Sequence, residues 1–484
     1  MLTLDRGELL RGAGAFLLAP RIRRAAPLPP TLAELQREIS GNVVGRSSPG
    51  YDRSRVLYNT RYDAYQPLAV VRCRTVSDVQ KTVVWARRHG IRIAPRSGGH
   101  SYGGYSSSPG GAIVDVSPLA RVSVRPGGRA VIGAGAKLID VYAALARHGA
   151  AIPAGSCATV GIGGQALGGG IGFLSRKLGT TSDNLLSLTL VTGDGEARTC
   201  SPTENPDLYW ASRGGGGGNF GIATQYAFRT APISSVATFV VEWPWAQART
   251  VISAWQAWAP HAPDELFSVC NVSSAPSIHV SGQLIGSTTR LRALLGPLVS
   301  AGTPTSVRLT QRRFLEAAEY WAGCGPVSEC HLEPLGGLTR ATFAAKSDYV
   351  RRPLPAAATT TIVQAVQRAP VRGSLLLDSY GGALNRVPKE ATAFVHRDSL
   401  CSLQYLAAWD ASGDGPASIA WLRSFYAAMR PYVSGEAYVN YIDPDLSGRP
   451  QAYYGQNLPR LVSIKRRYDP ANVFRFRQSI PLHV

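Results

Sequence analysis

The residues of this 484-residue chain best suited to chemistry lie in a glycine-rich run between positions 96 and 104. Within it, Gly99-His100-Ser101-Tyr102-Gly103 matches the Gly-x-Ser-x-Gly elbow that presents the nucleophilic serine of α/β-hydrolases. That elbow requires a helix directly after it, whereas the Ser-, Pro- and Gly-rich residues 105–111 cannot begin a long one. Consecutive glycines instead expose backbone N–H groups that suit a pyrophosphate, and a plain glycine turn is the alternative.

Two further glycine-rich runs cover residues 155–172 and 213–222. A dinucleotide fingerprint can be fitted to Gly161, Gly163 and Ala166, but no strand leads directly into it. No P-loop is present, and no Cys/His spacing fits zinc, so no metal site is predicted. Three glycine loops in one unit cost chain entropy, which favours a long ligand lying across them. Taken singly, Cys157 also fits a buried core thiol and His100 a loop histidine.

Composition excludes several classes of protein. The hydrophobic share of 45% is enough for large cores, and no apolar run is long enough to span a membrane. Seven cysteines in 484 residues do not make a small disulfide scaffold. The net charge is +20, but the arginines are scattered and no block of five basic residues occurs. We therefore expect a solvated basic surface and no nucleic-acid or membrane partner; a preference for anionic ligands is left open.

Hydrophobic periodicity divides the chain into two kinds of structure. Up to about residue 231, strands (68–73, 91–95, 112–116) alternate with helices (77–90, capped by Ser77, and 138–147), and hairpins occur at 122–132 and from 185. From 234 to 435, long alternating strands (238–243, 278–285, 375–380) are separated by helices (288–298, 314–320). The second pattern predicts an antiparallel sheet with helices on one face. A final helix is predicted at 458–467.

The N-terminus and two cysteines bear weakly on localisation. Residues 1–26 are similar to a twin-arginine export signal in which one of the paired arginines is missing. Cys324 and Cys330 are close enough in sequence to form a small disulfide loop, and free thiols are the alternative. Together these features favour a secreted or exported protein over a cytoplasmic one.

Taken together, the three glycine-rich runs resemble those of the berberine bridge enzyme-like flavin oxidases, within the vanillyl-alcohol-oxidase (PCMH-type) FAD-binding fold. The resemblance continues in the segments 345–349, 380–382, 438–443 and 468–474 and covers nearly the whole chain. It implies a two-domain α+β fold with an FAD-binding domain at 27–233. A substrate-binding domain with an antiparallel sheet is expected at 234–435, and a C-terminal segment, 436–484, is expected to return to the FAD domain.

The resemblance also assigns residues to the cofactor. His100 matches the histidine bonded to the flavin 8α-methyl, and Cys157 the cysteine bonded to flavin C6, so bicovalent FAD is predicted. Both side chains are good nucleophiles toward an electron-poor flavin. The remaining FAD-binding residues are expected to be Arg96, Ser97, Gly98, Gly99, Ser101, Val160, Gly163, Gly168, Gly169, Gly172, Asn219, Ile222 and Asn457. Valine at position 160 resembles the oxidases rather than the dehydrogenases of the family.

Tyr441 and Tyr380 match active-site tyrosines of the family's sugar and phenol oxidases, although Tyr380 also fits a packed strand aromatic. Tyr441 would act as a base only if its pKa were lowered by cations or by an ordered network, in which Asp378 is a candidate. The implied reaction oxidises a secondary alcohol or hemiacetal carbon of a sugar or glycosylated natural product. The hydride passes to flavin N5, and O2 reoxidises the flavin to give H2O2.

Two alternatives remain at this point. One is oxidative cyclisation or dehydrogenation of a phenolic, polyketide or alkaloid natural product. The other is a flavin-binding protein without turnover. The expected partners are thus a small-molecule substrate and O2.

Overall fold

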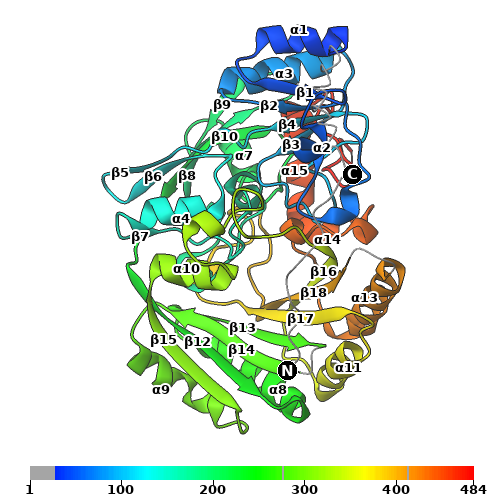
Figure 1. The fold of residues 1–484 in the computed structure, drawn as a ribbon. Helices are drawn as coiled ribbons and strands as arrows, with labels where there is room; N and C mark the ends of the chain where they lie inside the picture. The colour runs from blue at the N-terminus through cyan, green and yellow to red at the C-terminus, as the bar shows by residue number, and fades with distance from the viewer. Residues whose placement is uncertain (1–27, 275–276, 411–413, 484) are drawn as a thin grey trace, which may run out of the picture.

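The computed structural model describes residues 28–274, 277–410 and 414–483. The export-like segment, residues 1–26, lies outside the described residues. Figure 1 shows two packed parts, with the first strands and the C-terminal helices in the upper part and a large sheet with its own helices below. In the described ranges, no helix combines the length and apolar character needed to cross a bilayer.

The upper part contains a four-stranded sheet in the order β1-β2-β4-β3. Its strands are β1 (Asn42–Gly45), β2 (Ala69–Arg72), β3 (Ile93–Arg96) and β4 (Ala112–Asp115). The last three pair in parallel, and β1 pairs antiparallel with β2. The helices α1 (Pro30–Glu38), α2 (Tyr51–Arg55) and α3 (Val76–Arg88) belong to the same region. The cap of α3 is Thr75, not the predicted Ser77, because Thr75 and Asp78 form a reciprocal capping box.

A five-stranded antiparallel sheet stands beside it in the order β5-β6-β10-β8-β9. Its strands are β5 (Val122–Arg125), β6 (Arg129–Gly133), β8 (Leu185–Val191), β9 (Ala197–Cys200) and β10 (Ile222–Arg229). The helices here are α4 (Leu138–Ala146), α5 (Ile162–Leu167), α6 (Ser175–Leu178) and α7 (Pro206–Ala211). A short pair, β7 (Ala150–Ala151) with β11 (Ala231–Pro232), leads to the lower part.

The lower part is one seven-stranded antiparallel sheet in the order β15-β12-β14-β13-β17-β18-β16. Its strands are β12 (Ser235–Trp243), β13 (Leu266–Ser273), β14 (Ser277–Leu284), β15 (Ser306–Arg313), β16 (Thr342–Val350), β17 (Arg372–Ser379) and β18 (Cys401–Trp409). The helices α8 (Ala248–Trp258), α9 (Thr288–Val299), α11 (Ala356–Gln367) and α13 (Gly415–Met429) lie on its outer side (Figure 1). The predicted α+β fold with a large antiparallel sheet is therefore confirmed.

The two faces of this sheet differ because successive side chains of a strand point to opposite sides. Leu375 and Leu377 of β17 are fully buried in the core formed with the helices. Leu376 and Asp378, between and after them, instead line a cavity on the other face. The sheet is thus a core layer on one side and a site wall on the other.

The C-terminal segment packs into the upper part. It contains α14 (Gln451–Tyr454) and α15 (Leu458–Tyr468), and its apolar residues share a core with the two upper sheets. Fully buried Lys465 donates hydrogen bonds from Nζ to the carbonyls of Asn219 (2.7 Å) and Phe474 (2.6 Å) and pairs with Asp469. The helix α10 (Phe314–Ala322) also packs against this upper core, although it follows β15 in sequence. Cys324 and Cys330, after α10, form a disulfide.

Candidate functional site

A cavity of about 790 Å³ lies between the glycine-rich loops and the inner face of the large sheet. Its upper wall comes from all three glycine-rich runs, and its lower wall from β13, β17 and β18, with one residue each from β14 and β16. The sheet contributes Phe267, Val269, Asn271, Leu376, Asp378 and Gln404. Ligand sites typically occupy about 300–1,000 Å³ and place a few polar groups in a mainly apolar wall, as here. The three glycine-rich runs thus meet at one ligand-sized site.

The glycines of this wall serve two purposes. A Cβ on Gly98 or on Gly161 would overlap with the other loop, so these glycines allow the two loops to touch. A Cβ on Gly164 would meet nothing within 4 Å, and one on Gly217 would meet only Gly164 Cα, at 3.7 Å. Packing therefore does not explain those two glycines, whereas a ligand lying against the backbone does. Buried Arg96 Nη1, in the same wall, has no hydrogen-bond partner among the described residues. The wall thus fits an extended, anionic cofactor such as FAD.

His100 stands in this wall just after β3. Its ring stacks on Tyr58 with centroids 4.0 Å apart, and its Nε2 lies 2.9 Å from Thr159 Oγ1. Burial, and secondarily the positive charge of Lys137, lowers the pKa of His100 to about 3. The imidazole is therefore neutral at physiological pH and keeps a nucleophilic lone pair.

Cys157 lines the same cavity. Among the free cysteines of the described chain it is the exposed one, and the space it faces is this cavity. Its position inside the fold raises the pKa of the thiol, since burial disfavours the thiolate. The structure thus brings the two predicted attachment residues, His100 and Cys157, to one site.

Most of the other predicted cofactor residues also line the cavity. These are Arg96, Ser97, Gly98, Gly99, Ser101, Val160, Gly163, Gly172, Asn219 and Ile222. The sequence did not single out the flanking Gly216–Gly218 individually, although they lie in its third glycine-rich run.

Four predicted site residues do not line the cavity: Gly168, Gly169, Asn457 and Tyr380. Cβ atoms on Gly168 and Gly169 would overlap with Asn440 and Phe394, so both glycines serve packing. Buried Asn457 donates Nδ2 hydrogen bonds to the Lys389 and Thr392 carbonyls. Fully buried Tyr380 places its hydroxyl 3.3 Å from that of Tyr349. The predicted contacts of these four residues with FAD or substrate therefore have no support in the geometry.

Tyr441, in the 3-10 helix Val439–Tyr441, does reach the cavity. Its ring stacks on Tyr102, with centroids 5.1 Å apart, and meets the edge of Tyr438. Burial raises the pKa of Tyr441 well above its ordinary value, and the neighbouring Tyr102 and Asp378 raise it further. A raised pKa keeps the Tyr441 hydroxyl protonated at neutral pH, which is the opposite of the lowering that a tyrosine base requires.

Asp378, which the sequence suggests only as part of a tyrosine network, is the acidic group of this cavity. It is the one carboxylate among the described residues that line the cavity, and it lies at the end of β17. Burial raises its pKa to about 7, opposed in part by a 3.4 Å hydrogen bond from Ser402 Oγ. The strand period could have found it, because Leu375 and Leu377 occupy the core face.

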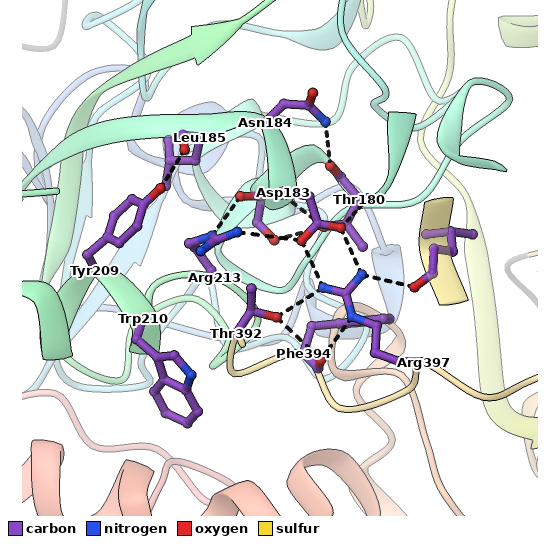
Figure 2. A network of polar contacts seen from close by, with 12 residues as sticks. Thr180, Asp183, Asn184, Leu185, Tyr209, Trp210, Arg213, Thr392, Phe394 and Arg397 are labelled. Carbon is purple, nitrogen blue, oxygen red and sulfur yellow. Dashed lines mark hydrogen bonds and ion pairs between the residues drawn. The ribbon is translucent and has the colours of Figure 1, made fainter. Parts of the chain in front are cut away.

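A buried ion-pair network lies beside the second glycine-rich run. Figure 2 shows Arg397 pointing at Asp183, with Arg213 approaching the same carboxylate. The Arg397 guanidinium makes two hydrogen bonds of 2.8 Å to Asp183 and one of 3.0 Å to Thr392. Next to Asp183, the Ser182 N–H donates to the Gly169 carbonyl (2.9 Å). The network therefore joins a loop of the lower part to the glycine-rich run that carries the cavity wall.

Two family models match this chain. The one described as "FAD binding domain" matches residues 67–201, and the one described as "Berberine and berberine like" matches residues 437–481. The first covers β2 through β9 with the first two glycine-rich runs, and the second covers the segment with Tyr441 and α15.

Relatives that match this chain over most of their length support the same family. The uncharacterized FAD-linked oxidoreductase YgaK of Bacillus subtilis is 35% identical over 452 residues, covering 92% of this chain and 97% of that protein. Aclacinomycin-N/aclacinomycin-A oxidase of Streptomyces galilaeus is 34% identical over 480 residues, covering 87% of this chain and 86% of that protein.

Solved structures superpose over nearly the whole chain. Physcomitrella patens BBE-like 1 has a TM-score of 0.89 at 33% identity and covers 94% of this chain and 99% of its own. Chitooligosaccharide oxidase has a TM-score of 0.86 at 28% identity, with 93% and 99% covered. Two variants of Phl p 4, which differ by one isoleucine-to-valine exchange, are described as a glucose dehydrogenase and a glucose oxidase, at TM-scores of 0.87 and 0.86 and 30% identity. They too cover 93% of this chain and 99% of their own. The chain belongs to the berberine bridge enzyme-like FAD-linked oxidoreductases of the PCMH-type FAD-binding family.

Proposed function

We propose that this enzyme oxidises a secondary alcohol or hemiacetal carbon of a sugar, free or attached to a natural product, and that O2 is its electron acceptor. The observation that most strongly supports this proposal is the position of Asp378. This carboxylate, with a pKa of about 7, lines the cavity opposite the glycine-rich loops. A carboxylate of that pKa is a suitable general base at neutral pH.

His100 and Cys157 would hold FAD through two covalent bonds, while the glycine loops and Arg96 receive its pyrophosphate. When bound, FAD accepts a hydride from the substrate carbon and passes the electrons to O2, giving hydrogen peroxide. Both attachment residues line one cavity, and neutral His100 keeps the lone pair that bond formation needs.

Asp378, Tyr441 and Gln404 have different proposed roles toward the substrate. Asp378 takes the proton of the hydroxyl being oxidised. Tyr441, whose raised pKa keeps it protonated, donates a hydrogen bond to the substrate oxygen. Gln404, whose Nε2 donates to the Tyr102 hydroxyl at 2.8 Å, fixes the ring that stacks on Tyr441. A sugar as substrate is supported by the sugar oxidases among the relatives and by the polar side chains Asn271, Asp378 and Gln404 on three neighbouring strands.

A peroxide-release screen over reducing sugars, glycosides and phenols tests this function. Peroxide formed with sugars or glycosides, in amounts equal to the oxidised product, is the expected result. Release with phenols alone would indicate oxidative cyclisation instead, and no release with any compound would remove the oxidase proposal.

A further inference from the structure

We propose that Thr159 and Tyr58 are positioning residues for the covalent attachment at His100. They hold the imidazole between them, so that one ring nitrogen is occupied and the other is left to bond the flavin. This inference rests on the proposed covalent linkage and concerns residues that themselves form no bond to FAD.

Tyr58 fixes the plane of the ring. Its aromatic ring is stacked on His100 with centroids 4.0 Å apart and planes 19° from parallel. Tyr58 is itself anchored, because its N–H donates to the Gly99 carbonyl (3.1 Å) and its carbonyl accepts from the Ala341 N–H (3.3 Å). The imidazole therefore cannot tilt toward Tyr58, and its position on that side is set by the backbone next to it.

Thr159 fixes the rotation of the ring within that plane. Its Oγ1 lies 2.9 Å from His100 Nε2, and the residue is only 6% exposed. The loop around it is tied to the start of α4, where the Leu138 N–H donates to the Val160 carbonyl and the Ile139 N–H to the Ala158 carbonyl. Because this contact engages Nε2, we assign Nδ1 as the nitrogen available to the flavin.

The groups around His100 also favour the protonation state of the imidazole that can react with the flavin. With the imidazole neutral, one nitrogen carries the proton and the other the lone pair. The attachment uses the tautomer in which Nε2–H donates to Thr159 Oγ1 and the lone pair is on Nδ1. The positive charge of Lys137, whose Nζ donates to the Ser97 carbonyl at 3.0 Å, opposes protonation of the ring.

The attachment step balances with O2 as oxidant. A bond forms between the imidazole nitrogen and the flavin 8α-carbon, while the imidazole N–H and one methyl C–H bond are broken. The two electrons of the C–H bond enter the flavin ring and pass to O2, which takes up the two protons released and becomes H2O2. Thr159 and Tyr58 change neither reactant; they raise the fraction of time that the nitrogen spends in position to react.

The test compares how flavin is attached in purified full-length variants. Thr159→Val removes the hydroxyl at constant shape, Thr159→Ser retains a hydroxyl, and Thr82→Val is the matched control. Thr82 is a buried threonine in α3 whose Oγ1 donates to the Asp78 carbonyl, outside the site. Each protein is precipitated with acid, and the released flavin is quantified. Mass spectrometry of the peptides containing residues 100 and 157 then shows which of them carries flavin.

We expect Thr159→Val to retain the Cys157 bond and to form the His100 bond about 10- to 100-fold more slowly. Thr159→Ser and Thr82→Val should match the parent. Equal His100 attachment in Thr159→Val and parent would overturn the role of Thr159. Should Thr159→Val not accumulate as folded protein, Tyr58→Leu decides in the same way, because it removes the aromatic ring that stacks on His100. If the parent itself releases all its FAD, the covalent linkage fails, which is a separate outcome from failure of the positioning role.

Discussion

Asp378 and Tyr441 illustrate how burial divides roles between two side chains that face one cavity. Burial raises the pKa of both groups. For the carboxyl, that moves the pKa to about 7, where it can accept a proton at neutral pH. For the phenol, it moves the pKa away from neutrality and leaves a hydrogen-bond donor. The same physical cause thus suits Asp378 to the proposed role of base and Tyr441 to the proposed role of hydrogen-bond donor.

Two substitutions separate these roles. Asp378→Asn should keep the flavin bound and lower the rate of anaerobic flavin reduction by about 10²–10⁴, the usual contribution of a general base. Tyr441→Phe should lower it less, because it removes one hydrogen bond. Stopped-flow absorbance of the flavin measures both rates. A larger loss in Tyr441→Phe than in Asp378→Asn would return the role of base to the tyrosine.

The pH dependence follows from the pKa of Asp378. The carboxyl is protonated and inactive as a base below its pKa of about 7, and it ionises as the pH rises. The kcat/KM should therefore increase with pH through about 7 and level off above it. In Asp378→Asn, the decrease of kcat/KM below pH 7 should disappear. A profile that falls between pH 6 and 8 would contradict the assignment.

Val160 bears on the electron acceptor. It lines the cavity three residues after Cys157, and we propose that O2 reaches the flavin beside it, where a larger side chain would leave less space. Val160→Leu should slow reoxidation of the reduced enzyme by O2 and leave reduction by substrate unchanged. Stopped-flow mixing of reduced enzyme with aerated buffer measures this step. Equal oxygen rates in the two proteins would show that Val160 controls no access.

At the scale of elements, the segments with strong periodicity could be predicted from the sequence. The alternating run in β17 and the helix α9 were found to within a few residues. The glycine loops were found too, because few other structures require so many glycines. Long-range packing could not be predicted. Gly168 and Gly169 face Asn440 and Phe394, from far along the chain, and nothing near them in sequence distinguishes them from glycines that face a ligand.

The buried Arg397–Asp183 pair is the element-scale feature most sensitive to substitution. Arg397 is 1% exposed in its side chain and Asp183 8%, so removing the arginine leaves the buried carboxylate with only the more distant Arg213, at 3.8 Å, as a charged partner. Arg397→Met should lower the free energy of unfolding by about 3–5 kcal/mol. Arg386→Met, which breaks the exposed pair with Asp264 near the same loop, should cost at most about 1 kcal/mol. Urea unfolding followed by tryptophan fluorescence compares them, and similar losses would refute a special role for the buried network.

The whole molecule places two cores on either side of one cavity. The upper core combines the first sheets with the C-terminal helices, and the lower core joins the large sheet to its outer helices. The cofactor wall comes from the upper part and Asp378 from the lower part, so the site exists only where the two meet. Sequence patterns indicate both parts, but the raised pKa on which the proposed role of Asp378 rests comes from burial in the assembled cavity.

The most direct test of the proposed oxidase is a single turnover without oxygen. The purified enzyme is mixed anaerobically with each member of a panel of reducing sugars, glycosides and phenols, and the flavin absorbance is followed. A sugar or glycoside should bleach the flavin, and admission of air should restore the colour with one H2O2 formed per flavin. Flavin that stays oxidised with every sugar and glycoside, in protein that retains its full complement of FAD, would contradict sugar oxidation at this site.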